Sequence, residues 1–201
     1  MLVLASASPR RRELLTQAGF TFEVRPANIP EDPLPNEDPI AYVVRLAREK
    51  AEAVYAEITN AIASEKRASA APQVLGADTT VTLDNQILGK PIDAADAARM
   101  LRLLSGRTHR VITGVAVVTA ARTEAAAEVT AVEFLKLSEE EIEAYIATGE
   151  PMDKAGAYAI QGRAARWIPR IEGDYSNVVG LPLALVTTLL NSLESKTSLS
   201  S

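Results

Sequence analysis

The chain has 201 residues, 47% of them hydrophobic, and a formal net charge of −5. This length fits one domain, with room for two lobes, and the negative charge argues against broad attraction to nucleic acids or membrane surfaces while leaving room for a local basic site. The absence of cysteine excludes disulfides and thiolate metal sites, and it agrees with the reducing cytoplasm in which we expect the protein. No apolar run reaches the roughly 18 residues of a membrane helix.

The N-terminal segment predicts a buried strand that leads into a helix. Residues 2–5 form an apolar run too short for a helix, which is typical of a buried strand. Ser8 and Pro9 then suit the N-cap and the first position of a helix, and Gly19 suits its C-terminal end. The alternating residues 20–24 predict a second strand.

The next part of the chain alternates turn-forming and apolar segments. Its expected elements are a loop over 27–39, a helix to about residue 63, a connection over 64–72, strands over 74–83 and 87–88, and a helix between Asp93 and Gly106. The loop carries four prolines and four acids, and Asp38 with Pro39 repeats the cap-then-proline pattern. Asp84 and Asn85 suit a tight turn. The expected inward side chains are Tyr42, Leu46, Ala53 and Val54 in the first helix and Ala97, Met100, Leu101 and Leu104 in the second.

The C-terminal half predicts an antiparallel pair of strands followed by shorter elements. These are strands over 108–119 and 130–137 joined by a soft alanine stretch, a helix ending at Gly149, a strand over 164–171, a turn at Gly173 and Asp174, and a helix over 183–193. Ser138 and Glu141 form a capping box before the first of these helices. The sum is a mixed α/β domain over residues 1–195 with a frayed tail over 196–201.

Three consecutive arginines, Arg10 to Arg12, stand at the start of the first predicted helix. A helix N-terminus offers free N–H donors and a partial positive charge, and arginine adds planar donors, so the segment suits a phosphate group. Positive side chains oppose the helix dipole there, at a cost of roughly 0.3–1 kcal/mol per exposed charge. Arginines are also common on solvated helix surfaces, so this segment alone leaves both interpretations open.

Two later segments also carry residues suited to chemistry. In GADTTV, Asp78 interrupts an apolar, β-rich run, and a carboxylate buried there needs a cation, a metal or hydrogen-bond donors. Lys90, in the GKP segment that follows, is a candidate to face the same cleft. In DKAGAYAIQG, two glycines allow close backbone approach to a ligand, and Gln161 supplies both a donor and an acceptor, as reading a base edge requires. An exposed strand carboxylate and an ordinary loop are the plainer alternatives.

The remaining reactive residues argue against nucleophilic catalysis. His109 is the single histidine and has no serine or cysteine nucleophile paired with it, so we expect a structural role for it and a core or cleft-wall position for Trp167. No Walker P-loop and no GxGxxG motif are present, which leaves ordinary P-loop and Rossmann folds without support. Arginine, lysine and hydroxyl donors with one or two acids suit a nucleotide phosphate and a divalent metal.

Several segments, taken in order, resemble the Maf family of nucleotide pyrophosphatases. They are LASASPRRRELL, YVVRLAREKA, LGADTTV, LGKP, MLRLLSGRTHRVITGVAV, DKAGAYAIQG and VVGLPL, and they run from about Leu2 to Leu193. The resemblance implies an ITPase-like α/β fold, with an elongated, mixed, mostly antiparallel sheet flanked by helices and a central cleft between two lobes. It also implies hydrolysis of a nucleoside triphosphate between the α and β phosphates with Mg²⁺ or Mn²⁺, or Co²⁺ as a third option, and a homodimer that binds neither nucleic acid nor membrane.

The same resemblance implies a substrate. Arg11, Thr79 and Gln161 match the family branch that hydrolyses dTTP and UTP, which also tends to accept modified pyrimidine nucleotides and would suit a house-cleaning role. A 7-methyl-GTP pyrophosphatase is the nearer alternative, although that branch usually differs at all three positions. A nucleotide-binding regulator of septum formation without turnover is the alternative from another class. Asp78, Glu31 and Lys90 argue for an enzyme, because a pure binder has no need of a metal-activated water.

The residue roles follow as hypotheses. The expected catalytic set is Asp78, Lys90 and Glu31, with Asp78 and Glu31 also facing the metal. The expected substrate-binding set is Ser8, Arg11, Lys50, Thr79, Lys154 and Gln161. Asp78 would act as general base for water, Ser8 and Arg11 would hold the triphosphate, and the three lysines would neutralise the leaving pyrophosphate. Thr79 and Gln161 would read the pyrimidine.

Overall fold

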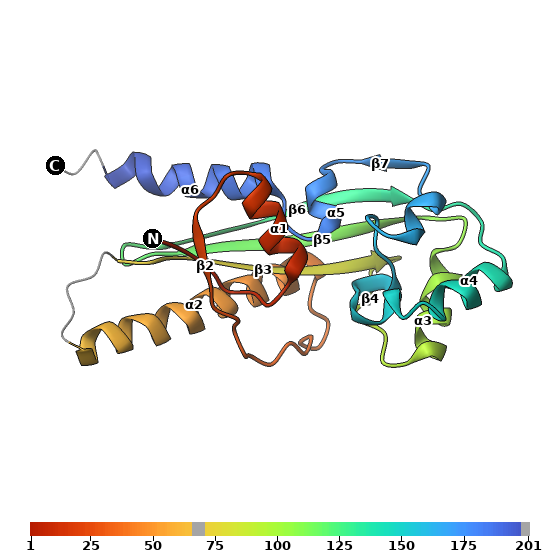
Figure 1. Cartoon of the computed structure of the whole chain (residues 1–201), viewed down its shortest axis with the longest axis horizontal. Coiled ribbons are helices and arrows are strands. Elements are labelled where there is room, and N and C mark those ends of the chain that lie inside the picture. Colours follow the sequence, from red (N-terminus) through yellow and green to blue (C-terminus); the bar gives the residue numbers. More distant parts are fainter. Residues whose placement is uncertain (66–70, 198–201) are drawn as a thin grey trace.

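One seven-stranded sheet runs along the molecule and carries helices on both faces (Figure 1). The structure, a computed structural model, describes residues 1–65 and 71–197. The strands are β1 (Leu2–Leu4), β2 (Phe22–Val24), β3 (Gln73–Leu83), β4 (Gln86–Leu88), β5 (Thr108–Val118), β6 (Thr123–Glu133) and β7 (Arg170–Glu172).

The sheet is mixed and mostly antiparallel. Its order is β2-β1-β3-β5-β6-β7, and β4 pairs with β3. Strand β1 is parallel to both β2 and β3, whereas β3, β5, β6 and β7 pair antiparallel in turn. The long β3–β5–β6 ladder forms the axis of the molecule, which confirms the elongated sheet that the family resemblance implies.

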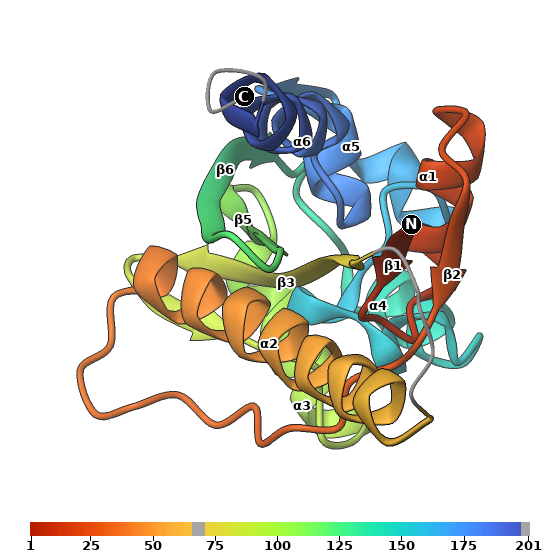
Figure 2. The same ribbon diagram turned by 90° about the vertical axis from the view of Figure 1, so that its left-hand side faces the viewer.

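The helices cover the sheet unevenly. They are α1 (Pro9–Gln17), α2 (Pro39–Glu65), α3 (Ala94–Leu104), α4 (Glu139–Ile146), α5 (Tyr175–Val179) and α6 (Leu183–Thr197). Three short 3₁₀ helices, η1 (Glu150–Asp153), η2 (Ala155–Ala157) and η3 (Arg163–Trp167), lie between α4 and β7. The end-on view shows α2 and α6 on opposite faces of the sheet (Figure 2).

Several local patterns determine element boundaries as the sequence predicts. Ser8 caps α1 and accepts a hydrogen bond from the Arg11 amide, Asp93 caps α3, and Ser138 forms the complete capping box of α4. Asp84 and Asn85 both adopt positive φ in the turn between β3 and β4. These features depend on neighbours within a few residues, so the sequence carries them directly.

Helix α2 packs directly on the sheet at Gly76. A Cβ atom at this position would lie 2.1 Å from the Ala47 carbonyl oxygen and 2.9 Å from the Ala51 amide nitrogen. A side chain at position 76 would therefore hold the helix away from β3, and glycine permits the close contact. This contact fixes the distance between α2 and β3, and with it the position of α2 side chains such as Lys50 above the strand.

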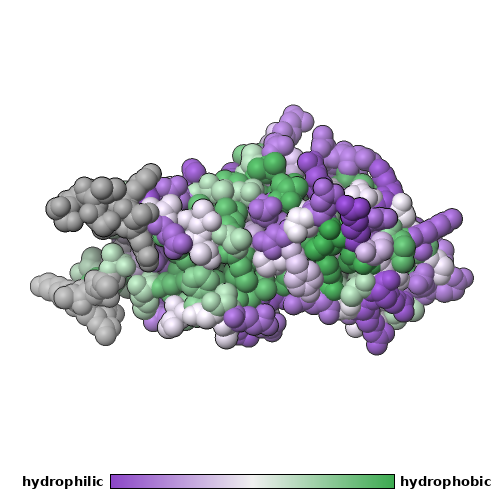
Figure 3. Space-filling model, turned by 90° about the horizontal axis from the view of Figure 1, so that it is seen from above, coloured by the Kyte–Doolittle hydropathy of each residue, from purple (hydrophilic) through white to green (hydrophobic). Residues whose placement is uncertain are grey.

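The buried side chains fall into two lobes. In the first lobe, α1, α5 and α6 pack on one face of the sheet, with Leu4, Leu75, Val115 and Leu181 fully buried, and α2 packs on the other face in separate groups that include Val54 and Leu46 (Figure 2). The second lobe packs α3, α4 and the 3₁₀ helices around Leu101, Phe134 and Trp167. Seen from above, hydrophobic surface lies over the middle of the molecule and hydrophilic residues crowd the end formed by the second lobe (Figure 3). No helix within the described ranges is long and apolar enough to cross a membrane.

The predicted alanine connection between two strands is wrong. The turn instead lies at Thr119–Arg122, where the Thr119 amide donates to the Arg122 carbonyl at 3.0 Å, and the alanines at 125–127 belong to β6, opposite 114–116 of β5. Their low intrinsic strand preference is outweighed by the ladder and by packing of Ala126 and Ala127 against the cores. Strand β6 ends at Glu133, and 134–137 are not part of it.

The strand predicted over 164–171 is also wrong for most of its length. Residues 163–167 form η3, and β7 covers Arg170–Glu172. The Trp167 indole packs edge-on against Tyr145 and donates to Glu141 at 3.1 Å. These contacts with α4 draw the segment into a tight turn away from the sheet.

Smaller boundaries differ as well. Helix α4 ends at Ile146, short of the predicted Gly149. In α2, Ala51 is buried and the predicted Ala53 is exposed, because the buried stripe follows the 3.6-residue period of the helix. The predicted connection over 64–72 begins inside α2, and 66–70 lie outside the described residues. Lys196 and Thr197 belong to α6, and the rest of the predicted tail, 198–201, also lies outside them.

Candidate active site

A cleft of about 540 Å³ opens between the two lobes. Its walls come from the β1–α1 loop, the loop before α2, the middle of β3, the residues after β4, and the segment from η1 to Gln161. The cleft brings together every site residue expected from the sequence: Ser8, Arg11, Glu31, Lys50, Asp78, Thr79, Lys90, Lys154 and Gln161.

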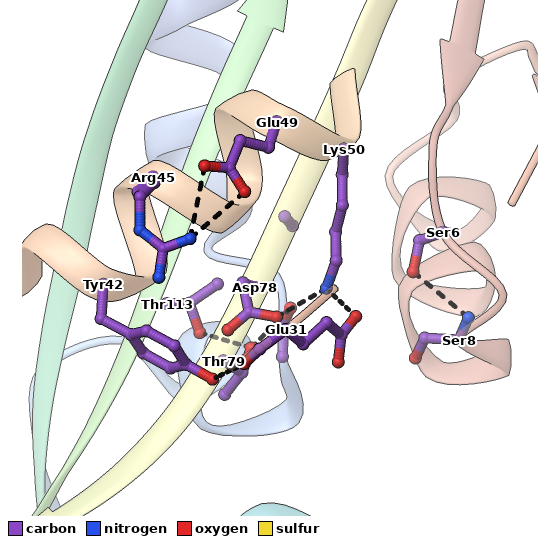
Figure 4. Close-up of polar contacts among 12 residues, drawn as sticks. Ser6, Ser8, Glu31, Tyr42, Arg45, Glu49, Lys50, Asp78, Thr79 and Thr113 are labelled. Atoms are coloured by element: carbon purple, nitrogen blue, oxygen red, sulfur yellow. Dashed lines mark hydrogen bonds and ion pairs between the residues drawn. The ribbon is translucent and has the colours of Figure 1, made fainter. Parts of the chain in front are cut away.

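Lys50 joins two carboxylates at the centre of this cleft (Figure 4). Its Nζ lies 2.7 Å from Asp78 Oδ1 and 2.6 Å from Glu31 Oε1. Lys50 and Asp78 are only 7% and 8% exposed, whereas Glu31 lies in the exposed loop before α2. A buried lysine requires a partner of this kind, because an unpaired buried charge is strongly unfavourable.

The environments of the two carboxylates shift their pKa values in opposite directions. Burial raises the pKa of Asp78 above its usual value, and the opposing attraction of Lys50 and Arg11 does not outweigh it. Desolvation also acts to raise the pKa of Glu31, but the Lys50 hydrogen bond and nearby cations lower it overall. Carboxylates with separated pKa values suit different chemical roles, the more basic one as proton acceptor.

The loop that carries Glu31 is fastened to α2. The Tyr42 hydroxyl donates to the Glu31 carbonyl oxygen at 2.8 Å, and burial, with Asp78 and Glu31 nearby, raises the pKa of Tyr42 to about 12. Arg45 forms two hydrogen bonds with the Glu37 carboxylate, at 2.6 and 2.7 Å, and donates to the Asp32 carbonyl at 3.2 Å. These contacts hold Glu31 over the cleft although its loop has no regular structure.

Arg11 has internal partners for most of its donors. It donates to the Gly180 and Ala77 carbonyls at 2.8 and 2.9 Å, to Ser6 Oγ at 3.1 Å and to Thr79 Oγ1 at 3.0 Å. Desolvation lowers its pKa, while Asp78 opposes the shift. These contacts join α1 to the β1–α1 loop, to β3 and to the residue that follows α5, so Arg11 fixes the Thr79 hydroxyl at the cleft.

The other two arginines of the N-terminal segment, Arg10 and Arg12, differ in their position relative to the cleft. Arg10 lines the cleft and pairs with Asp153 at 3.7 Å, whereas Arg12 is exposed and does not line it. The Ser8 amide donates to Ser6 Oγ at 3.2 Å (Figure 4). The start of α1 thus faces the cleft with Ser6, Ser8 and the partly exposed Arg10, and a helix N-terminus with an arginine suits an anion.

Two more cations and an amide approach from the second lobe. Lys90 is exposed at the cleft, and the neighbouring Gly89 carbonyl accepts from the Gly156 amide at 3.1 Å, which fixes it against η2. Lys154 Nζ contacts Asp153 at 2.6 Å and the Glu150 carbonyl at 3.0 Å. Gln161 lies exposed at the cleft wall.

Sequence reasoning missed two cleft residues. Tyr42 was expected only as a core residue, although its spacing from Leu46 and Lys50 by multiples of four places all three on one helix face. Thr80 lines the cleft, and its buried Oγ1 has no hydrogen-bond partner in the described ranges; only its two-residue offset from Asp78 indicated this position. His109 is buried against Tyr158, and Trp167 lies in the second core, as expected.

Comparison with known proteins bears on the cleft. A family model described as "Maf-like protein" matches residues 1–193. The chain belongs to the Maf family. The match covers both lobes of this Maf protein and all the cleft residues named above.

Three relatives, each named dTTP/UTP pyrophosphatase, align along nearly their whole length. The one from Koribacter versatilis (strain Ellin345) is 52% identical over 189 residues, which cover 94% of this Maf chain and 92% of the relative. That from Geobacter metallireducens is 53% identical over 194 residues, covering 96% and 95%. That from Moorella thermoacetica is 54% identical over 194 residues, covering 94% and 93%.

Proposed function

We propose that this Maf protein hydrolyses dTTP and UTP, together with modified pyrimidine nucleotides, to the nucleoside monophosphate and inorganic pyrophosphate. The observation that carries the proposal is the meeting of Lys50, Asp78 and Glu31 in a cleft whose walls also carry the cations Arg10, Lys90 and Lys154. The names of relatives about half identical to this chain support the reaction and the pyrimidine substrate.

The proposed chemistry assigns Asp78 the role of general base. Its carboxylate accepts the proton of the water that attacks the α-phosphorus, and the pyrophosphate leaves. The α1 N-terminus with Ser8 holds the phosphates, and Lys50, Lys90 and Lys154 offset the charge that grows on the leaving group. In phosphoryl chemistry, positioning and electrostatic stabilisation supply most of the catalysis.

Mg²⁺ or Mn²⁺, with Co²⁺ as a third candidate, fits the donors of this cleft. Within the described part of the chain no group of three or more histidine, cysteine or acidic residues could form a complete metal cage. Mg²⁺ is held by one or two carboxylates together with substrate phosphates, and Asp78 and Glu31 supply such a pair. A bound metal would polarise the phosphoryl oxygens.

The proposed pyrimidine recognition uses Thr79 and Gln161. Thr79 Oγ1 contacts Arg11, Thr113 Oγ1 at 2.9 Å and the Gly180 carbonyl at 3.3 Å. Arg11 therefore acts on the substrate mainly by fixing the Thr79 hydroxyl. Gln161 offers one donor and one acceptor face to the base edge.

A nucleotide screen tests the proposal. The purified chain is incubated with canonical and modified nucleoside triphosphates and 7-methyl-GTP in Mg²⁺, Mn²⁺ or Co²⁺, and the products are separated by ion-exchange chromatography. We expect dTTP and UTP to give monophosphate and pyrophosphate fastest. Orthophosphate as product or a preference for 7-methyl-GTP would contradict the proposal, and stoichiometric nucleotide binding without turnover would favour the septum regulator.

The family resemblance supports two further proposals, a homodimer and a cytoplasmic location. Size-exclusion chromatography with light scattering of the purified protein tests the first, with a mass of twice 21.5 kDa expected for the dimer. Fractionation of cells that express the chain tests the second. A monomer over the whole concentration range, or recovery outside the cytoplasmic fraction, would contradict them.

A further inference from the structure

The segment that carries Gln161 is held from behind by residues that do not line the cleft. The Ala159 amide donates to the Tyr145 hydroxyl at 3.2 Å, and this hydroxyl donates to Glu150 Oε1 at 2.8 Å. The Arg163 amide donates to Glu150 Oε1 and Oε2 at 3.1 and 3.3 Å. Gln161 thus stands midway between two backbone amides fastened to one tyrosine–glutamate pair.

Gly162 permits the Glu150 carboxylate to approach this closely. A Cβ atom at position 162 would lie 1.8 Å from Glu150 Oε1 and 2.5 Å from its Cδ. Any larger residue would therefore push the carboxylate away from the Arg163 amide. Glycine follows Gln161 here because the backbone packs directly on the carboxylate.

The pair is itself well anchored. Tyr145 is 2% exposed and packs edge-on against Trp167, with ring centroids 5.1 Å apart. The backbone carbonyl of Glu150 accepts from Lys154 Nζ at 3.0 Å. Glu150 therefore contacts Lys154 through its backbone carbonyl and the Gln161 segment through its side chain. A substitution of the Glu150 side chain leaves the carbonyl that accepts from Lys154 in place.

The Gln161 side chain has no such support of its own. It is exposed, and no hydrogen bond to its amide is found among the described residues. An amide reads a base edge only if it is held at the right place and angle, and disorder in its backbone costs binding energy at each encounter. Fixing the backbone on both sides supplies the missing constraint.

We propose that Tyr145 and Glu150, with Gly162 as the required small residue, are positioning residues that set base selectivity by holding the Gln161 segment. The inference rests on the proposed function, because it takes Gln161 as the reader of the pyrimidine. It assigns selectivity to a network outside the cleft that touches neither phosphates nor metal. Substitution in this network changes discrimination between bases more than it changes the rate with the preferred substrate.

The test compares kcat/KM for dTTP and dCTP in five forms of the full chain. These are the wild type, Glu150→Ala, Glu150→Gln, Gly162→Ala and the double variant Glu150→Ala with Gly162→Ala. Glu143→Ala, an exposed acid of the same α4 region, serves as the matched control. The ratio of two substrates is insensitive to the folded fraction, so a partly unfolded variant still reports on selectivity.

We expect Glu150→Ala to lower the preference for dTTP over dCTP about tenfold, since losing a hydrogen bond to a charged acceptor changes an equilibrium constant by roughly tenfold or more. Glu150→Gln keeps an oxygen at the Oε1 position and should retain most of the preference, as should Glu143→Ala. Gly162→Ala should resemble Glu150→Ala. The double variant should be no worse than either single one, because both act on the same contact.

The outcomes separate the inference from the function beneath it. A wild type that prefers dTTP while Glu150→Ala keeps the same ratio would overturn the inference and leave the proposed function intact. An additive double variant, or an equal loss in Glu143→Ala, would also overturn it. A wild type that hydrolyses neither nucleotide would refute the proposed function, and the inference with it.

Discussion

Replacing Asp78 with asparagine separates its part in the reaction from its part in the fold. Asparagine keeps the size of the side chain and an oxygen that can accept from Lys50, but it cannot take a proton from water. Asp78 is 8% exposed, and its pKa is raised by desolvation. A buried group that is disfavoured in its charged form destabilises the folded state once it ionises.

Both effects have an expected magnitude. Loss of a general base costs about 10²–10⁴ in rate, which corresponds to roughly 2.7–5.4 kcal/mol of transition-state stabilisation. In the fold, the Lys50–Asp78 ion pair becomes a hydrogen bond from a charged donor to a neutral acceptor, a loss of about 1 kcal/mol. Removing the ionisation penalty of Asp78 offsets that loss, so we expect the free energy of unfolding to change by no more than about 1 kcal/mol.

The assay measures pyrophosphate release from dTTP at saturating Mg²⁺, together with the melting temperature of each protein. Asp78→Asn should lose at least about a hundredfold in kcat while its melting temperature stays within roughly 4 °C of wild type. A kcat within a few-fold of wild type would refute the base assignment. A large fall in melting temperature that accounts for the lost activity would refute the electrostatic reasoning.

Three further variants test neighbouring features. Arg11→Lys leaves buried carbonyls without donors and should lower the free energy of unfolding by about 2–4 kcal/mol, measured by urea denaturation; an unchanged midpoint would contradict the internal role of Arg11. Burial lowers the pKa of His109 to about 3, so the unfolded chain gains a proton below about pH 6.5 while the folded chain does not, and stability should fall by about 1.4 kcal/mol per pH unit from there. His109→Gln should reduce this slope between pH 6.5 and 5.5, and an equal slope would show that other groups cause it. Glu37→Ala removes a side chain that is 8% exposed and that fixes the Glu31 loop through Arg45. Glu31 would then be held less firmly at the metal, so the Mg²⁺ concentration for half-maximal activity should rise about tenfold. An unchanged Mg²⁺ requirement would place Glu31 away from the metal.

The local elements of this protein could be predicted because their causes lie close together in the sequence. Ser8, Asp93 and Ser138 cap helices through amides three residues away, and Asp84 with Asn85 turns a hairpin through its own backbone. The failures have distant causes. The alanines of β6 are strand because β5 pairs with them, and Trp167 lies in a 3₁₀ helix because Tyr145 and Glu141 contact it.

The candidate site divides in the same way. Residue types alone pointed to Asp78 as a buried carboxylate in need of a partner, and Lys90 as a residue that could face the same cleft. The partner in the structure is Lys50, 28 residues earlier in the chain. Family resemblance supplied the full set of site residues, but it did not reveal that most donors of Arg11 serve the protein itself.

The caps, the turns, the supply of cations and acids, and the family could all be predicted from the order of the residues. Which charges meet depends on how the helices and strands pack. Helix α2 lies against Gly76, and this contact brings Lys50 down between Asp78 and Glu31. An ion pair depends on distances of a few ångströms between residues far apart in the chain, and packing of whole elements sets those distances.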